Sequence, residues 1–118
     1  MRIIIAGAGE VGFHLAKLLA SEGKDITLID TDQDKLGTVT KNLDLVGIKG
    51  SSTSYTTLVD AGVSKADLLI SATSSEEINL TTAMMAKHLG TKRTVARISN
   101  TEFLFNRDKI DLKGNQSA

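Results

Sequence analysis

The 118-residue sequence contains no cysteine and no proline, and aromatic residues make up only 3% of it. Without cysteine the chain has no disulfide, no thiolate metal site and no cysteine nucleophile, a composition compatible with a reducing cytosol. Interdomain linkers are often rich in proline, glycine or serine, and no such stretch precedes the polar residues 113–118. We therefore expect one domain over residues 1–112, followed by a polar tail that could mark where a longer protein was cut.

The chain also lacks an excess of either charge and lacks a long apolar run. Fourteen basic residues balance fourteen acidic ones, so the basic surplus typical of nucleic-acid-binding proteins is missing. The apolar run at residues 3–6 is far shorter than the ~20 residues of a membrane-spanning helix and lacks the layout of a signal peptide. We expect a cytoplasmic protein with no nucleic-acid partner.

What the sequence does contain is a regular alternation of two patterns. Continuous apolar runs of strand length, bounded by turn residues, are typical of strands buried on both faces of a parallel sheet. Apolar residues at helical spacing define the segments between them. The predicted strands cover residues 2–6, 25–29, 45–48, 68–72 and 94–98. The apolar helix positions are Val11, Leu15, Leu18 and Leu19, then Leu36, Val39 and Leu43, then Leu58 and Val59, then Ile78, Leu80, Ala83 and Met84.

Glycines and a capping motif mark the helix ends. Gly23 stands where a left-handed C-terminal cap is expected, and Gly62 and Gly90 are expected to end the third and fourth helices. Ser74 with Glu77 forms a Ser-x-x-Glu capping box before the last helix. Strand and helix alternate at least four times, which predicts a parallel sheet with right-handed crossovers and helices on both faces. The expected fold is α/β, a Rossmann-like doubly wound sheet in three layers.

A Gly-x-Gly-x-x-Gly turn lies between the first predicted strand and the first helix, at Gly7-Ala8-Gly9-Glu10-Val11-Gly12. Gly7 permits the tight turn, Gly9 lets the backbone approach a pyrophosphate, and Gly12 lets the helix pack closely on the sheet. The free N–H groups of the helix N-terminus then face the anion. The alternative is a plain strand-to-helix turn that binds nothing.

An acidic residue stands at the end of the second predicted strand, where this fold holds the adenosine ribose. Asp30 follows Gly12 by eighteen residues, and its carboxylate is expected to accept hydrogen bonds from the ribose hydroxyls. A 2′-phosphate would meet a negative charge there, which favours NAD or an adenine nucleotide over NADP. Asp30, Thr31 and Asp32 are also suited to capping the second helix, so both roles stay open.

Two later strand ends are expected at the same crevice, because ligands of open α/β sheets bind beyond the carboxyl ends of the strands. These are residues 50–53, Gly-Ser-Ser-Thr, and residues 72–75, Ala-Thr-Ser-Ser. Their hydroxyl groups are suited either to an adenine edge or phosphate, or to turn and cap hydrogen bonds. Arg97 falls within the fifth predicted strand, where its guanidinium needs a phosphate or carboxylate partner, with Glu76 and Glu77 as the candidate carboxylates.

These motifs occur in the order found in the N-terminal nucleotide-binding domains of TrkA-type proteins. They are the glycine turn, residues 30–32, Ala61-Gly62 followed by Ala66-Asp67, residues 73–79 and residues 96–98. The chain resembles this family, the KTN or RCK domains, over residues 1 to about 105. The resemblance is more specific than the glycine turn, since Asn79 and the Ala96-Arg97-Ile98 run have no role that generic dinucleotide binding explains.

The resemblance implies a pocket for NAD(H) or for ATP, ADP or AMP. It also implies a homo-oligomer, a dimer that assembles into a tetramer or ring, on the inner face of the membrane beside a potassium transporter subunit. Glu10 stands where many relatives carry Arg, and it would repel a γ-phosphate, which favours NAD(H). Residues 50–53 replace the Gly-Asp-Ala-Thr of many relatives. The candidate cofactor-binding residues are Gly7, Ala8, Gly9, Glu10, Val11, Gly12, Asp30, Thr31, Asp32, Gly50, Ser51, Ser52, Thr73, Ser74 and Arg97.

Catalytic groups are not apparent in the sequence. His14 and His88 lie on predicted helices, Tyr55 is followed four residues later by Val59 rather than Lys, and no P-loop or clustered metal-ligand pattern occurs. We therefore expect a non-catalytic regulatory domain with no metal site. The alternative is the NAD-binding half of an oxidoreductase whose acid/base group lies elsewhere.

Overall fold

The computed structural model describes residues 1–98, so the expected domain end at residue 112 and the tail at 113–118 lie outside the described residues. Strands and helices alternate along the chain, and the strands form one five-stranded parallel sheet in the order β3-β2-β1-β4-β5. The strands are β1 (Arg2–Ala6), β2 (Asp25–Asp30), β3 (Val46–Lys49), β4 (Leu68–Ser71) and β5 (Arg93–Ala96). The helices are α1 (Glu10–Ser21), α2 (Gln33–Asn42), α3 (Tyr55–Ala61) and α4 (Glu76–Leu89), with a 3₁₀ turn, η1 (Val63–Lys65), before β4.

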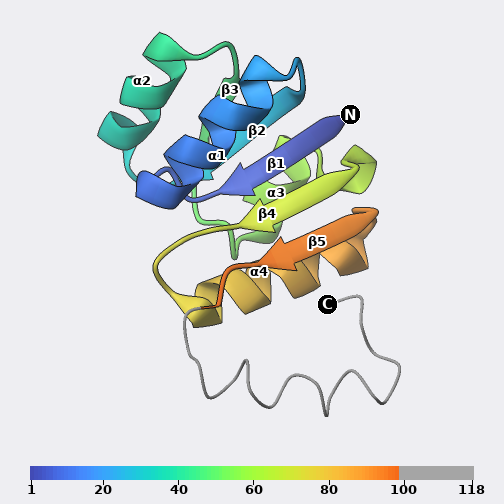
Figure 1. The fold of residues 1–118 in the computed structure, drawn as a ribbon. Helices are drawn as coiled ribbons and strands as arrows, with labels where there is room; N and C mark the ends of the chain where they lie inside the picture. The colour runs from blue at the N-terminus through green and yellow to red at the C-terminus, as the bar shows by residue number, and fades with distance from the viewer. Residues whose placement is uncertain (99–118) are drawn as a thin grey trace.

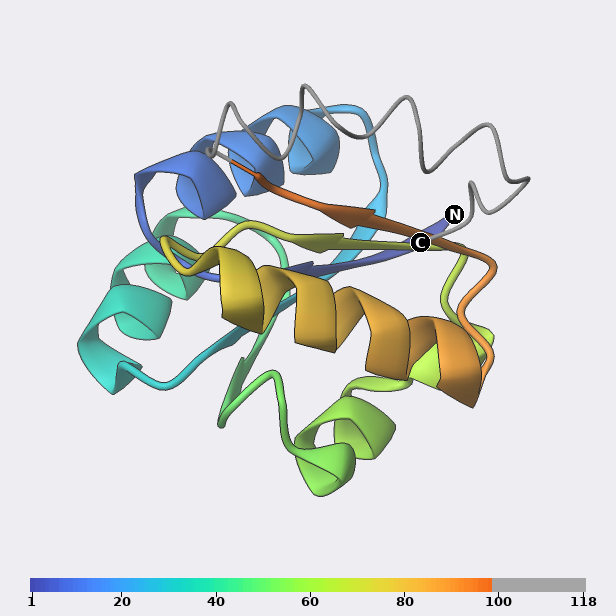
Figure 2. The same ribbon diagram turned by 90° about the horizontal axis from the view of Figure 1, so that it is seen from below.

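The sheet lies between two layers of helices (Figures 1 and 2). Alternate residues of the central strand β1 contribute to opposite cores, because successive side chains of a strand point to opposite faces. Ile3 and Ile5 pack with buried residues of α1 and α2, whereas Ile4 packs with Leu58 of α3 and Ala86 of α4. This arrangement confirms the expected Rossmann-like, three-layer α/β fold.

The central and edge strands differ in burial. β1 is buried from Ile3 to Ala6, as expected of a strand covered on both faces. β3 forms one edge of the sheet, and Val46 in it is 56% exposed. The expectation of burial on both faces is therefore wrong for β3, and also for the other edge strand, β5, where Val95 is 50% exposed. Within residues 1–98 the helices do not cover both faces of the edge strands as fully as they cover those of β1.

Helix ends follow the sequence pattern with one correction. Gly23 has positive φ, which confirms the expected left-handed cap, and Gly62 and Gly90 end α3 and α4 as expected, also with positive φ. The cap of α4 is Ser75, whose hydroxyl accepts a hydrogen bond from the N–H of Ile78, rather than Ser74. The predicted Ser74–Glu77 capping box is wrong, because the helix begins one residue later.

Three apolar side chains assigned to helix core faces are exposed. Leu18, Val59 and Met84 are 56%, 49% and 64% exposed. In α1 the buried residues are the small ones, Gly12 and Ala16, because this helix lies close to the sheet. Helical spacing predicts the position of an apolar stripe to within about one residue. Which residues of that stripe are buried depends on how closely the helix packs on the sheet.

Candidate functional site

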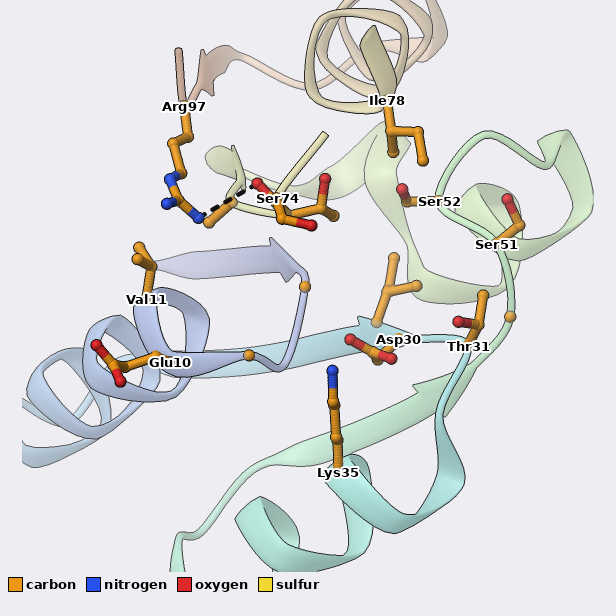
Figure 3. A pocket seen from close by; sticks show the side chains of 16 residues that line it. Glu10, Val11, Asp30, Thr31, Lys35, Ser51, Ser52, Ser74, Ile78 and Arg97 are labelled. Carbon is orange, nitrogen blue, oxygen red and sulfur yellow. Dashed lines mark hydrogen bonds between the residues drawn. The ribbon is translucent and has the colours of Figure 1, made fainter. Parts of the chain in front are cut away.

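A cavity of about 510 Å³ opens at the carboxyl ends of the strands, within the range of small-molecule sites in proteins. The first turns of α1 and α4 and the loops after β2, β3 and β4 surround it (Figure 3). Most of the residues expected at the site line this cavity, namely Gly7, Gly9, Glu10, Val11, Asp30, Thr31, Gly50, Ser51, Ser52, Thr73, Ser74 and Arg97. Ala8, Gly12 and Asp32 are not among the lining residues.

The glycine turn packs as tightly as its sequence suggests. Gly7 has φ of +111°, and a Cβ there would lie 3.0 Å from the Ala72 carbonyl and the Thr73 nitrogen. A Cβ at Gly9 would meet nothing within 4 Å, so this position faces open space. A Cβ at Gly12 would lie 1.7 Å from the Gly7 oxygen, so Gly12 allows α1 to pack on the turn itself rather than mainly on the sheet.

The N-terminus of α1 has no side-chain cap. Within residues 1–98, the other α-helices begin with Asp32, Ser54 and Ser75, and each of these side chains accepts a hydrogen bond from a backbone N–H. Gly9 at the start of α1 has no side chain to do so. Because the first N–H groups of a helix have no partner within the helix, those of α1 face the cavity as donors for an anion.

Asp30 ends β2 and is fixed by two backbone N–H groups. Its Oδ2 accepts from the Ala8 nitrogen at 2.7 Å and its Oδ1 accepts from the Asp32 nitrogen at 2.7 Å. The carboxylate thereby ties the glycine turn to the start of α2, and each oxygen keeps a further lone pair for a ligand hydroxyl. Asp32 is the cap of α2, accepting from the nitrogens of Asp34 and Lys35.

The loop after β3 is held against α4. Ser52 is 7% exposed, and its hydroxyl lies 2.8 Å from the Thr82 hydroxyl, which also donates to the Ser52 carbonyl at 3.1 Å. Ser51 bonds to Thr53 within the same loop. Ser52 is therefore committed to a buried protein contact, whereas Ser51 is exposed at the cavity.

Arg97 lies beyond the end of β5, on the side of the cavity across from Thr31 and Ser51 (Figure 3). Its side chain is exposed, and Nη1 donates to the Thr73 carbonyl at 3.4 Å (Figure 3). The expectation that Arg97 lies inside the fifth strand is wrong, because β5 ends at Ala96. An exposed guanidinium needs no buried counter-ion, so it is available to an anion in the cavity.

Three lining residues were not expected from the sequence: Ile29, Lys35 and Ile78. Ile29 lines the cavity from a strand end, as does Ala72 of the expected segment 72–75. Lys35, in the first turn of α2, points its side chain toward Asp30 (Figure 3). Ile78 in the first turn of α4 is 41% exposed and was assigned to the helix core face. Their position in the first turn of a helix that follows a strand end is the signal that could have identified Lys35 and Ile78.

Asp67, a carboxylate with a shifted pKa, lies at the amino ends of the strands, away from the carboxyl ends where the cavity opens. Asp67 accepts from the Arg2 backbone nitrogen at 2.8 Å and pairs with Lys92 at 3.3 Å. The Arg2 hydrogen bond first, and Lys92 second, lower the pKa of Asp67 below its ordinary value. Asp67 precedes β4, at the amino ends of the strands, so this pair belongs to the scaffold rather than to the cavity.

Residues 1–98 contain neither a cluster of metal ligands nor a helix able to cross a membrane. That part of the chain contains no group of three or more His, Asp or Glu residues arranged to hold a metal ion. His14 and His88 are both exposed. Among its helices none has the length and apolar character needed to cross a membrane.

The fold and the position of the cavity define the class, a Rossmann-type α/β domain with a crevice at the carboxyl edge of its sheet. The TrkA-N domain matches residues 3–112, and the chain belongs to this family. The Trk system potassium uptake protein TrkA of Haemophilus influenzae is 44% identical over 111 residues, which cover 93% of this chain and 24% of that protein. The chain thus spans about a quarter of the length of this relative.

Solved structures share the fold at low sequence identity. The NAD(P)-binding domain of an exopolyphosphatase-related protein from Archaeoglobus fulgidus has a TM-score of 0.77 at 15% identity, covering 97% of this chain and 83% of that one. The GsuK channel bound to NAD has a TM-score of 0.76 at 18% identity, covering 96% of this chain and 20% of that one. At these identities the likeness concerns the fold alone.

Proposed function

We propose that this chain is the nucleotide-binding regulatory domain of a Trk-type potassium uptake system, and that NAD(H) or an adenine nucleotide binds in the cavity. The observation that carries the proposal is the uncapped start of α1 beside the fixed carboxylate of Asp30, in one cavity. Donors for an anion and an acceptor for ribose hydroxyls then face the same ligand. The family, whose relatives are named as potassium uptake proteins, supports the regulatory role.

The cavity suggests how the ligand lies. The ribose of adenosine would bond to Asp30, with the exposed face of Ile78 and the hydroxyl of Ser51 beside the adenine. The diphosphate would lie over Gly9, where the backbone faces open space. The remainder would extend toward Val11 and Arg97.

One charge at the cavity, the carboxylate of Glu10, favours NAD(H) over ATP. Glu10, in the first turn of α1, lines the phosphate side and would repel a γ-phosphate. A dinucleotide places no terminal phosphate there. The GsuK channel, which shares the fold, has been solved bound to NAD, and this supports the same choice. ATP, ADP and AMP are the alternative ligands.

We propose a regulatory rather than an enzymatic role because the relatives of this family are named as potassium uptake proteins, and neither His14 nor His88 lines the cavity. The domain would act as a homo-oligomer at the inner face of the membrane, with a potassium transporter subunit as partner. A ligand can bias such an assembly only through its difference in affinity for two conformations, typically ~1–3 kcal/mol. Co-purification of a membrane subunit with this chain, gained or lost on adding NADH, tests the partnership.

Isothermal titration calorimetry of the chain with NADH, NAD, ATP and ADP tests the binding. We expect heat of binding with NADH or NAD, and binding by none of the four would overturn the proposal. The site itself is tested with Asp30→Ala. This change removes an ionised acceptor worth ~1.5–3 kcal/mol per hydrogen bond, so we expect at least about a tenfold loss of NADH affinity.

Asp32→Ala is the matched control for Asp30→Ala. It removes a carboxylate two residues away that caps α2 and does not line the cavity. We expect it to cost about 1 kcal/mol of stability and to leave NADH affinity unchanged. Equal affinities for the wild-type chain and Asp30→Ala would exclude the ribose role.

A further inference from the structure

Asn79 is the most heavily bonded polar side chain near the cavity, although it is not among the lining residues. It lies in α4, four residues after the Ser75 cap, and is 1% exposed. A buried amide must have its hydrogen bonds satisfied, and the partners that satisfy this one show what it organises.

Asn79 fixes the peptide groups on both sides of Thr73. Its Oδ1 accepts from the Thr73 nitrogen at 2.9 Å and from the Thr73 hydroxyl at 2.6 Å, and its Nδ2 donates to the Thr73 carbonyl at 2.9 Å. The Ser71 hydroxyl at the end of β4 also donates to Oδ1, at 3.1 Å. The loop that carries Thr73 and Ser74 along the cavity is therefore held in one conformation.

The same side chain reaches the segment after β5. Nδ2 also donates to the Arg97 carbonyl at 2.9 Å. The Arg97 nitrogen bonds to the Ser71 carbonyl at 2.8 Å, and its guanidinium bonds to the Thr73 carbonyl. Beyond Ala96 the strands β4 and β5 no longer pair, so Asn79 joins the two segments where the sheet ends.

We propose that Asn79 is a positioning residue that holds Thr73, Ser74 and Arg97 together as one wall of the cavity. This inference rests on the proposed nucleotide binding. This positioning role explains why residue 79 carries an amide, which both donates and accepts hydrogen bonds. Aspartate would present an oxygen to the carbonyls of Thr73 and Arg97, and an apolar residue would leave buried groups without partners.

The opposite wall is built independently of Asn79. Asp30 is fixed by the nitrogens of Ala8 and Asp32, which Asn79 does not contact. A ligand that reaches Thr73, Ser74 and Arg97 should therefore depend on Asn79, and a ligand that contacts Asp30 without reaching those three residues should not. NADH and adenosine provide this comparison, because adenosine has no phosphates or nicotinamide.

The test uses Asn79→Asp, which keeps the size and the accepting oxygen but loses both donated hydrogen bonds. The matched control is Thr91→Val, which removes a 2.7 Å hydrogen bond from a 2%-exposed hydroxyl to the Val63 carbonyl, away from the cavity. We expect both variants to lower the urea midpoint of unfolding. Asn79→Asp alone should weaken NADH by at least about tenfold, with adenosine affinity by NMR titration changed by less than about threefold.

Two results would overturn the inference: an NADH loss in Asn79→Asp no larger than that in Thr91→Val, or equal losses for NADH and adenosine. If Asn79→Asp does not fold, Asn79→Ser takes its place with the same expectations. Amide exchange of Thr73 in the nucleotide-free wild-type chain and in Asn79→Ser provides a second readout, and we expect faster exchange in the variant beyond its loss of global stability. A wild-type chain that binds no nucleotide would overturn the proposed function instead. This failure can be told apart from a failure of the Asn79 inference, because amide exchange at Thr73 would still be faster in Asn79→Ser than in the wild-type chain.

Discussion

Gly12→Ala places a methyl group at the closest contact in the glycine turn. Its Cβ would lie 1.7 Å from the Gly7 oxygen and 2.8 Å from the Gly7 carbonyl carbon. Even close C–H···O contacts have C···O distances of about 3.3–3.6 Å, so α1 or the turn must move by roughly 1.5 Å or more. The obstacle is backbone, which cannot rotate away as a side chain would.

The cost of that movement follows from two opposing effects. Overpacking of this kind typically costs about 1–3 kcal/mol, whereas replacing a helical glycine with alanine contributes about 0.5–1 kcal/mol in the other direction. We therefore expect Gly12→Ala to lower the free energy of unfolding by about 1–2 kcal/mol, which corresponds to a Tm lower by about 4 °C or more. NADH affinity should fall as well, because the uncapped N–H groups of α1 move with the helix.

Gly37→Ala is the matched control, since it makes the same substitution within a helix. A Cβ at Gly37 in α2 meets nothing within 4 Å, so we expect this variant to gain about 0.5–1 kcal/mol. Urea denaturation followed by circular dichroism measures both. A Gly12→Ala chain as stable as the Gly37→Ala chain would refute the close packing of α1 on the turn.

Three further predictions concern single positions. Gly9→Ala should leave the free energy of unfolding within about 0.5 kcal/mol, because the new Cβ meets nothing, yet weaken NADH in calorimetry by blocking the diphosphate; unchanged affinity would contradict the proposed pose. Ser75→Ala should cost about 1 kcal/mol in urea denaturation through loss of the α4 cap, and no loss would argue against that cap. Asp67→Asn should lower Tm at pH 7. The pKa of Asp67 is lowered in the folded chain, so its contribution to stability is present above the ordinary pKa of 3.8 and is lost as the pH falls through the lowered pKa. A Tm difference between the wild-type chain and Asp67→Asn that persists at pH 2 would therefore contradict this contribution.

Much of the site could be predicted because its elements are local in sequence. The glycine turn directly follows β1, Asp30 ends β2, and Thr73 and Ser74 follow β4, so chain order and the parallel sheet bring them to one edge. Lys35 and Ile78 were not predicted as site residues because helical periodicity indicates only whether a side chain faces the core or the solvent. In the first turn of a helix, a side chain can face the crevice instead.

Asn79 shows what local patterns do not carry. Its partners Ser71, Thr73 and Arg97 lie on both sides of it in sequence, and Arg97 is eighteen residues away. The shift of the α4 cap from Ser74 to Ser75 depends on the same loop, where Thr73 bonds to both Ser75 and Asn79. The side chains that form this network are brought together by loops that meet only in the folded chain. The one-residue shift of the α4 cap, from Ser74 to Ser75, follows from that network.

Three features could be predicted from local sequence: the alternation of strands and helices along the chain, the helix ends at Gly23, Gly62 and Gly90, and the position of the glycine turn. Each depends on periodicity or on conformations that glycine favours. Three others are visible only in the folded chain: which apolar residues are covered, the tie from Asp30 to the glycine turn and the start of α2, and the wall of the cavity that α4 holds. Those features depend on distances between segments far apart in the chain, which the packing of helices on the sheet sets.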